Sequence, residues 1–388
     1  MILKQFSYKE NMNVNNSWTL NDFTLNDKVN LLVGKNAVGK TRTINRIAVL
    51  AGMIKGQVQL SLEIINSADF DMEFSADPYS YKYSLRTKNR NIDSEIFSID
   101  GDEKLRRNSD GSGFIYYENE RKNFDFHATD NNPIVTYRRD ALQHPYLENL
   151  HKWASELRCY YFGSSRDMGQ NNVLATVNME EFSLDEVNIL ESFRINELFI
   201  NAKKEFGKIF TDIIINYMQE IGYEISSLAI EKNPYTAITV DDKSTIYMLC
   251  VKEQDRNAPT YQTAMSQGMF RALSLLIQIT YSIMIGVSST ILIDDIGEGL
   301  DFDRSTKLIE LLINIAEHSN IQLIMTTNDR YVMNKVPFKY WQLIDRKGEV
   351  CKIYNYQNAK DIFDEFKFTG LNNFDFLATD FINSERIL

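Results

Sequence analysis

The feature that most constrains the fold of this chain is a glycine-rich segment close to the N-terminus. Residues 34–41 read GKNAVGKT and match the pattern G-x-x-x-x-G-K-S/T without a gap. In such a segment the backbone N–H groups surround a phosphate, and the following helix presents its N-terminus to the same negative charge. Lys40 then reaches the terminal phosphates, and the Thr41 hydroxyl binds Mg²⁺. The residues expected to surround a bound nucleotide are Gly34, Lys35, Asn36, Ala37, Val38, Gly39, Lys40, Thr41 and Arg42.

The segments on both sides of this loop fit a strand and a helix. An apolar run at 29–33 precedes the loop and suits a strand. After the loop, apolar residues recur at spacings of three and four, which predicts an amphipathic helix carrying Ile44, Ile47, Ala48, Ala51 and Ile54 on one side. The alternative, an ordinary glycine-rich turn, is disfavoured because strand, loop and helix come in the required order.

A second motif is the apolar run STILIDD at 289–295, which ends in two carboxylates. A parallel strand buried on both faces is continuously apolar, and its carboxyl end is where α/β proteins bind ligands. Asp294 is then expected to hold Mg²⁺, and Asp295 to orient or deprotonate the attacking water. The alternative is a turn with two solvated aspartates, and it is disfavoured because the same chain carries a phosphate-binding loop.

Two shorter motifs flank this strand. Residues 265–269 read MSQGM and precede an apolar helix, so Ser266 and Gly268 offer a hydroxyl, a backbone N–H and a helix N-terminus to a phosphate. An ordinary helix cap explains the same residues. After the strand, Gly299-Leu300-Asp301 places a second aspartate seven residues beyond Asp294.

Taken together, the four motifs resemble ABC ATPases of the SMC and OLD-nuclease kind. The segment MSQGM resembles the L-S-G-G-Q signature in its Ser-x-Gly core, and Gly299-Leu300-Asp301 resembles the D-loop. The resemblance covers residues 28–45, 264–275 and 290–330. It implies ATP and Mg²⁺ as cofactors. It also implies a homodimer or higher homo-oligomer in which the nucleotide of one protomer meets residues of the other, here Ser266, Gln267, Gly268 and Asp301.

The chain departs from the family pattern at two positions. The family usually has Glu after the strand aspartate, whereas Asp295 is one methylene shorter, so slow hydrolysis is expected. Asn328 stands where a switch His would follow strand 321–325, and an amide bonds a γ-phosphate without taking its proton. Lys40, Asp295 and Asn328 are the expected catalytic residues. The expected metal ligands are Thr41, Asp294 and a Q-loop glutamine, Gln170, with Gln143 as the alternative.

The chain divides into five parts by pattern. Residues 1–55 and 258–356 form the two halves of an α/β P-loop ATPase core, with a mixed, mainly parallel sheet and flanking helices. Between them, 56–165 reads as an antiparallel β lobe with runs at 57–64, 79–86, 95–99 and 114–117. Residues 166–257 read as a short helical lobe with return strands, and 357–388 as a helical tail. No heptad run of SMC length lies between Thr41 and Met265.

Composition and charge exclude several classes of protein. The formal charge of −11 and pI near 5.1 argue against a generally basic nucleic-acid or membrane-surface protein. The apolar run 272–287 is too short and too polar to span a bilayer. Three scattered cysteines and an N-terminus without a signal peptide predict a cytoplasmic protein with no membrane partner. Three basic pairs, Lys88 with Arg90, Arg106-Arg107 and Arg138-Arg139, leave DNA contact as a possibility, although solvated loop charges are the favoured explanation for them.

Three functions follow from the resemblance. Only 59 residues follow Asp329, which leaves no room for the Toprim nuclease domain of OLD proteins, so any effector is expected to be a separate protein. ATPases of this build resemble the sensor or regulatory subunits of bacterial anti-phage systems such as Septu, PARIS or retron-linked modules, which gate a nuclease or toxin. The alternatives are a DNA-repair or recombination clamp and, least favoured, a transporter energy subunit.

Overall fold

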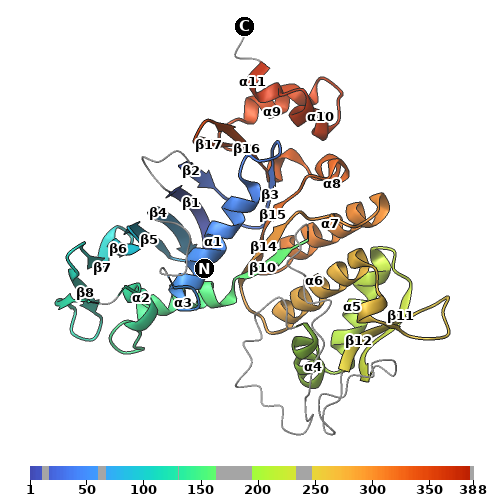
Figure 1. Cartoon of the computed structure of the whole chain (residues 1–388), viewed down its shortest axis with the longest axis horizontal. Coiled ribbons are helices and arrows are strands. Elements are labelled where there is room, and N and C mark those ends of the chain that lie inside the picture. Colours follow the sequence, from blue (N-terminus) through green and yellow to red (C-terminus); the bar gives the residue numbers. More distant parts are fainter. Residues whose placement is uncertain (11–16, 60–66, 130, 163–194, 233–246, 385–388) are drawn as a thin grey trace.

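A 14-stranded sheet dominates the structure, in the strand order β10-β14-β15-β3-β16-β17-β2-β1-β4-β5-β6-β7-β8-β9 (Figure 1). The computed structural model describes residues 1–10, 17–59, 67–129, 131–162, 195–232 and 247–384. The order of strands is far from the order of the chain, so segments from both ends of the sequence lie next to each other in the sheet.

One part of the sheet is parallel. It contains β10 (Arg158–Tyr161), β14 (Ser289–Asp294), β15 (Ile321–Thr326), β3 (Val29–Val33) and β16 (Trp341–Lys347). Every residue of β3, β14 and β15 is buried, because helices cover both faces of this part. The carboxyl ends of β14, β15 and β3 therefore meet at one edge of the sheet.

The remaining strands are mainly antiparallel. The hairpin strand β17 (Val350–Asn355) joins the two parts, since it pairs antiparallel with β16 and parallel with β2 (Trp18–Thr24). Beyond β2 all pairs are antiparallel: β1 (Ile2–Glu10), β4 (Ala68–Ala76), β5 (Tyr79–Lys88), β6 (Asn91–Ile99), β7 (Asp102–Arg107), β8 (Ser112–Tyr117) and β9 (Lys122–His127).

Two hydrophobic clusters form the core, one on each face of the sheet. Successive side chains of β3 point to opposite faces of the sheet, so Leu31 belongs to the first cluster and Leu32 to the second. The first cluster packs under α4 (Ile195–Phe206), α5 (Lys208–Glu220), α6 (Gln267–Met284) and α7 (Phe302–Glu317). The second packs under α1 (Lys40–Ile54), α2 (Ile134–Tyr137) and α3 (Pro145–Glu156) and continues into the antiparallel part.

Smaller elements complete the chain. A three-stranded sheet, β11 (Ile225–Lys232), β12 (Tyr247–Glu253) and β13 (Thr260–Tyr261), lies beside α4–α6 (Figure 1). The short helices η3 (Gln262–Ala264), α8 (Arg330–Lys335) and η4 (Phe338–Tyr340) connect core elements. The C-terminal segment is helical, as expected, with α9 (Lys360–Lys367), α10 (Asn373–Ala378) and α11 (Phe381–Ser384).

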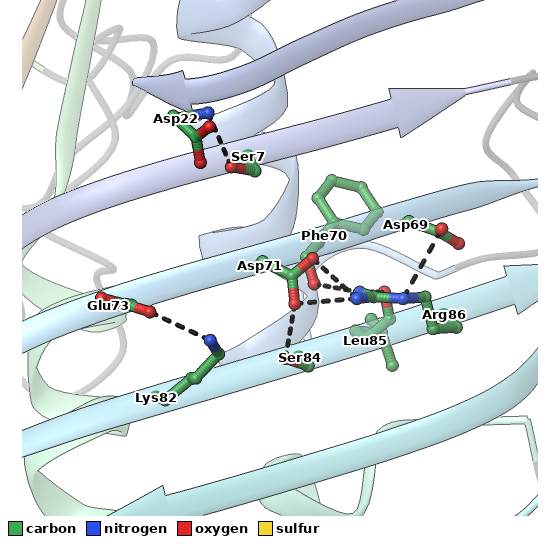
Figure 2. A network of polar contacts seen from close by, with 10 residues as sticks. All are labelled: Ser7, Asp22, Asp69, Phe70, Asp71, Glu73, Lys82, Ser84, Leu85 and Arg86. Atoms are coloured by element: carbon green, nitrogen blue, oxygen red, sulfur yellow. Dashed lines mark hydrogen bonds and ion pairs between the residues drawn. The ribbon is translucent and has the colours of Figure 1, made fainter. Parts of the chain in front are cut away.

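Cross-strand ion pairs lie on one face of β4 and β5 (Figure 2). Arg86 donates two hydrogen bonds to Asp71, at 2.8 and 2.6 Å, and lies 3.6 Å from Asp69. Lys82 pairs with Glu73 at 3.0 Å. Charges of both signs therefore neutralise each other on this face, in agreement with the argument against a generally basic binding surface.

The secondary structure confirms most of the elements expected in the core. The strand at 29–33, the helix after the loop, the strand before the two aspartates and the strand 321–325 are β3, α1, β14 and β15. The core sheet is mainly parallel as expected. Gln170 and residues 179–194 of the expected helical lobe lie outside the described residues.

The segment 56–165 differs from the expectation in two ways. Its C-terminal end, β10, pairs in parallel with β14 and so belongs to the core sheet, not to the antiparallel lobe. Residues 57–59 form no strand, and 60–64 lie outside the described residues. The physical reason for the first difference is that a four-residue strand shows no pattern from which its pairing direction can be read.

Candidate functional site

The loop between β3 and α1 is shaped by two close approaches. A Cβ at Gly34 would lie 2.6 Å from the carbonyl oxygen of Ile344 on β16. At Gly39 the backbone has φ of 112°, and a Cβ would lie 2.8 Å from Cζ2 of Trp18. Both positions therefore require glycine, because any larger residue would push the loop away from β16 or β2.

Lys40 folds back over this loop. Its Nζ donates to the carbonyl oxygens of Gly34, at 2.8 Å, and Lys35, at 3.2 Å. Burial lowers the pKa of Lys40, and the negative charges of Asp295 and Asp294 oppose that effect. The ammonium is thus held at the centre of the loop, where a phosphate would replace its carbonyl partners.

Thr41 and Asp294 meet at the start of α1. The Thr41 hydroxyl donates to Oδ1 of Asp294 at 2.9 Å, and the Thr326 hydroxyl at the end of β15 donates to the same oxygen at 2.7 Å. Asp294 is buried, whereas Thr41 is exposed to the cavity side. A hydroxyl and a carboxylate this close form a pair of hard oxygen ligands, which fits Mg²⁺ with water and phosphate oxygens completing its shell.

Asp295 follows in a left-handed conformation, with φ of 54°. Its N–H donates to the Thr326 hydroxyl at 2.8 Å, and its Oδ1 accepts from Nδ2 of Asn328 at 2.7 Å. Burial raises the pKa of Asp295, the neighbouring Asp294 raises it further, and Lys40 opposes the rise. Strained backbone and a shifted pKa at the end of a core strand are features of functional sites.

A cavity of about 390 Å³ opens beside the loop, a volume that suits a small ligand. It is lined by Trp18, Asn36, Ala37, Gly39, Lys40, Thr41, Arg42, Asn328 and Arg346. Seven of these were expected from the sequence; Trp18 and Arg346 were not. They reach the cavity from β2 and β16, and no sequence pattern marks them.

The signature-like segment lies at a separate place. Ser266 caps α6, and its hydroxyl accepts from the N–H of Met269 at 3.2 Å. Asp301 caps α7 and accepts from the N–H of Arg304 at 3.0 Å. Gly268 packs against the backbone of Gly299, so the two expected motifs contact each other.

The structure therefore forms two groups from the expected residues. Lys40, Thr41 and Asn328 line the cavity, and Asp294 and Asp295 are hydrogen-bonded to them. The residues of the second group are not among those that line the cavity within the described chain: Ser266, Gln267, Gly268 and Asp301.

Comparison of the chain with known proteins gives one kind of match. No protein-family model and no curated protein matches its sequence. An SMC head bound to the C-winged helix domain of ScpA is similar in structure over 91% of this chain and 97% of its own, with TM-score 0.51 and 14% identity. The Smc head domain with an extended coiled coil from Pyrococcus furiosus, bound to the C-terminal domain of ScpA, covers 94% and 99%, with TM-score 0.50 and 12% identity.

The chain has the fold of an SMC head domain. This likeness confirms the expected α/β class. At these identities the likeness shows the fold alone. The SMC-like fold places the loop, β14 and the signature-like helix in one architecture, while the chemistry of this chain depends on its own residues.

Two of the three basic pairs, Arg106-Arg107 and Arg138-Arg139, make contacts within the chain, whereas the side chains of Lys88 and Arg90 are exposed. Arg106 is hydrogen-bonded to Glu103, Arg107 is buried and donates to the carbonyl of Asn132 at 3.0 Å, and Arg139 donates to Glu148 at 2.9 and 2.6 Å. Arg138 lies over the ring of Phe126. Among the described helices, none is long and apolar enough to cross a membrane.

Proposed function

We propose that this SMC-like chain binds Mg²⁺-ATP in the cavity beside α1. The observation that carries the proposal is the convergence of Lys40, Thr41 and Asp294 from the loop, α1 and β14, with Thr41 and Asp294 only 2.9 Å apart. In this assignment, Lys40 leaves its carbonyl partners and pairs with the β- and γ-phosphates. Residues 34–42 surround the phosphates through backbone N–H groups and the N-terminus of α1.

Thr41 and Asp294 would hold Mg²⁺ in this site. The ion would supply charge neutralisation for the phosphates and fix their orientation. Gln170, the expected third ligand, lies outside the described residues and remains a prediction.

Hydrolysis is assigned to Asp295 and Asn328. The Asp295 carboxylate orients and deprotonates the attacking water, and its raised pKa suits a general base. Asn328 fixes that carboxylate through a 2.7 Å hydrogen bond and offers its amide to the γ-phosphate. Because Asp is shorter than the Glu usual in the family and because Asn328 occupies one of its oxygens, we propose a slow ATPase.

We further propose that ATP joins two copies of the chain. Ser266, Gln267, Gly268 and Asp301 lie away from the cavity of their own protomer, at helix N-termini that suit phosphate binding, and all of them except Gly268 are exposed. The close contact between Gly268 and Gly299 holds the start of α6 against the turn before α7. They are thus arranged to complete the nucleotide site of a second copy.

Regulation of a separate effector remains the biological role we favour. The proposal that this chain is the sensor or scaffold of an anti-phage system, gating a nuclease or toxin, is supported by the resemblance of its motifs. Two solved SMC heads with this fold are bound to a domain of ScpA, so a head of this fold can carry a protein partner. A DNA clamp is less well supported, because Arg106, Arg107 and Arg139 already have partners within the chain.

Light scattering of the Asp295→Asn variant tests the ATP-joined pair. This change removes the water-activating carboxylate and keeps the size of the side chain, so Mg²⁺-ATP is expected to hold the variant as dimers. The double variant Asp295→Asn, Ser266→Arg keeps the loop and places a bulky charge at the contact, so it is expected to bind ATP as a monomer. Monomers of the single variant with saturating ATP would contradict the pairing.

A further inference from the structure

The cavity beside α1 contains one cation that the proposed function has not used. Arg346 lines the cavity and is exposed, and its side chain makes no hydrogen bond or ion pair within the parts of the chain that the structure describes. The other arginine of the cavity, Arg42, lies 3.2 Å from the buried carboxylate of Glu10 and over the ring of Trp18. Arg346 is thus an available positive charge beside a loop built for phosphates.

The strand that carries Arg346 is firmly placed. β16 pairs with β3 through Leu343 and Val33, directly before the loop, and the carbonyl of Ile344 touches Gly34. Side chains alternate along a strand, so Arg346 points to the same face as Ile344, the face that α1 covers. Lys347 points to the opposite face and donates to Asn383 at 2.9 Å.

The strand order indicates which part of a bound nucleotide would lie beside Arg346. β14 and β15, which carry the Mg²⁺ and water-activating residues, lie on one side of β3, and β16, β17 and β2 lie on the other. A triphosphate with its γ end at Asp294 and Asp295 therefore has its α-phosphate and nucleoside on the β16 side. The positive charges of Arg346 and Arg42 also reach Cys351 on β17, where they oppose the rise that burial causes in its pKa, to about 11.

We propose that Arg346 binds the α-phosphate of the nucleotide. This inference rests on the proposed nucleotide site and adds a positioning residue that no motif of the sequence marks. The planar guanidinium matches two phosphate oxygens, and pairing with an ionised group is stronger than a neutral hydrogen bond. Arg346 would thus fix the nucleoside end, while Lys40 and Mg²⁺ hold the other phosphates.

Calorimetric titration of ATP and ADP, each with Mg²⁺, tests this assignment. Arg346→Ala is expected to weaken both nucleotides by the same factor, about tenfold or more, because both carry an α-phosphate. Arg346→Lys keeps the charge without the planar fork and is expected to fall between the wild type and Arg346→Ala. Lys347→Ala removes a neighbouring charge that points away from the cavity, so its affinities are expected to stay within about twofold of the wild type.

Three results would overturn the assignment. Unchanged affinities in Arg346→Ala would show that the guanidinium makes no contact, and a loss for ATP alone would place it at the γ-phosphate. An equal loss of affinity in Lys347→Ala would show that the effect comes from the overall positive charge of the β16–β17 hairpin and not from a contact made by Arg346. Lys40→Ala distinguishes failure of this assignment from failure of the nucleotide site. If Lys40→Ala no longer binds ATP while Arg346→Ala binds it normally, only the Arg346 assignment is contradicted. If the wild type does not bind ATP, both proposals are contradicted.

Discussion

A substitution at Gly268 tests how the signature-like helix is joined to the turn before α7. Gly268 is the second residue of α6, and a Cβ there would lie 2.8 Å from Cδ2 of Leu300 and 3.1 Å from the carbonyl carbon of Gly299, with the Gly299 oxygen closer still. Ordinary van der Waals contact begins at 3.4 Å. In Gly268→Ala, α6 and the turn must therefore separate by more than about half an ångström.

The expected cost follows from two opposing effects. Overpacking of this kind costs about 1–3 kcal/mol, and Ala gains back up to about 1 kcal/mol over Gly in a helix. The backbone of Gly268 has no positive φ, so no conformational strain adds to the clash. We expect Gly268→Ala to lower the free energy of unfolding by about 1–2 kcal/mol.

Urea denaturation followed by circular dichroism measures this change. Gln267→Ala is the matched control, because Gln267 is the exposed neighbour on the same helix and its truncation adds no atom; a change within about 0.5 kcal/mol is expected. Gly268→Ala should also weaken ATP-dependent pairing, because the starts of α6 and α7 move apart. A Gly268→Ala protein as stable as Gln267→Ala would refute the close contact between α6 and the turn.

Two further predictions concern titratable groups. Burial and the charge of Asp294 raise the pKa of Asp295, so the ionised carboxylate destabilises the nucleotide-free protein at pH values above that pKa. Asp295→Asn should therefore have a higher thermal midpoint than the wild type at pH 7–8, and the difference should shrink as pH falls. A lower midpoint for the variant would contradict this expectation. Burial also raises the pKa of Glu95 from 4.5 to about 7. The stability that the protonated Glu95 contributes is lost as pH rises from 4.5 to 7, by up to about 3 kcal/mol. Glu95→Gln should lack this dependence of the free energy of unfolding on pH, as measured by urea denaturation. The same dependence in both proteins would contradict this expectation.

The sequence was sufficient to predict the local elements that bear the motifs. The glycine loop, the helix with Ile44 and Ile47, and the apolar strand before Asp294 each carry a pattern confined to a few neighbouring residues. Their meeting at one sheet edge follows from the general rule for parallel strands, which the core obeys. The structure accordingly brings Thr41 and Asp294, 253 residues apart, to hydrogen-bonding distance.

The remaining parts of the site depend on long-range pairing, which a single sequence does not reveal. Arg346 reads as an ordinary hairpin charge until β16 is paired with β3, and Trp18 reads as a core residue until Gly39 is seen against its ring. The antiparallel lobe was recognised, but β7 is polar and lacks the alternation of a half-buried strand. By contrast, β4 alternates clearly at Phe70, Met72 and Phe74, but no strand was expected there, although this alternation is a signal by which it could have been found.

The central claim is that the cavity beside α1 binds Mg²⁺-ATP through Lys40, and titration calorimetry tests it most directly. Mg²⁺-ATP is titrated into the wild type and into Lys40→Ala, with circular dichroism confirming that both are folded. The buried ammonium lies between the loop carbonyls and the two aspartates, so its loss is expected to weaken binding by about a hundredfold or more. Equal ATP affinity in the two proteins would contradict the nucleotide site.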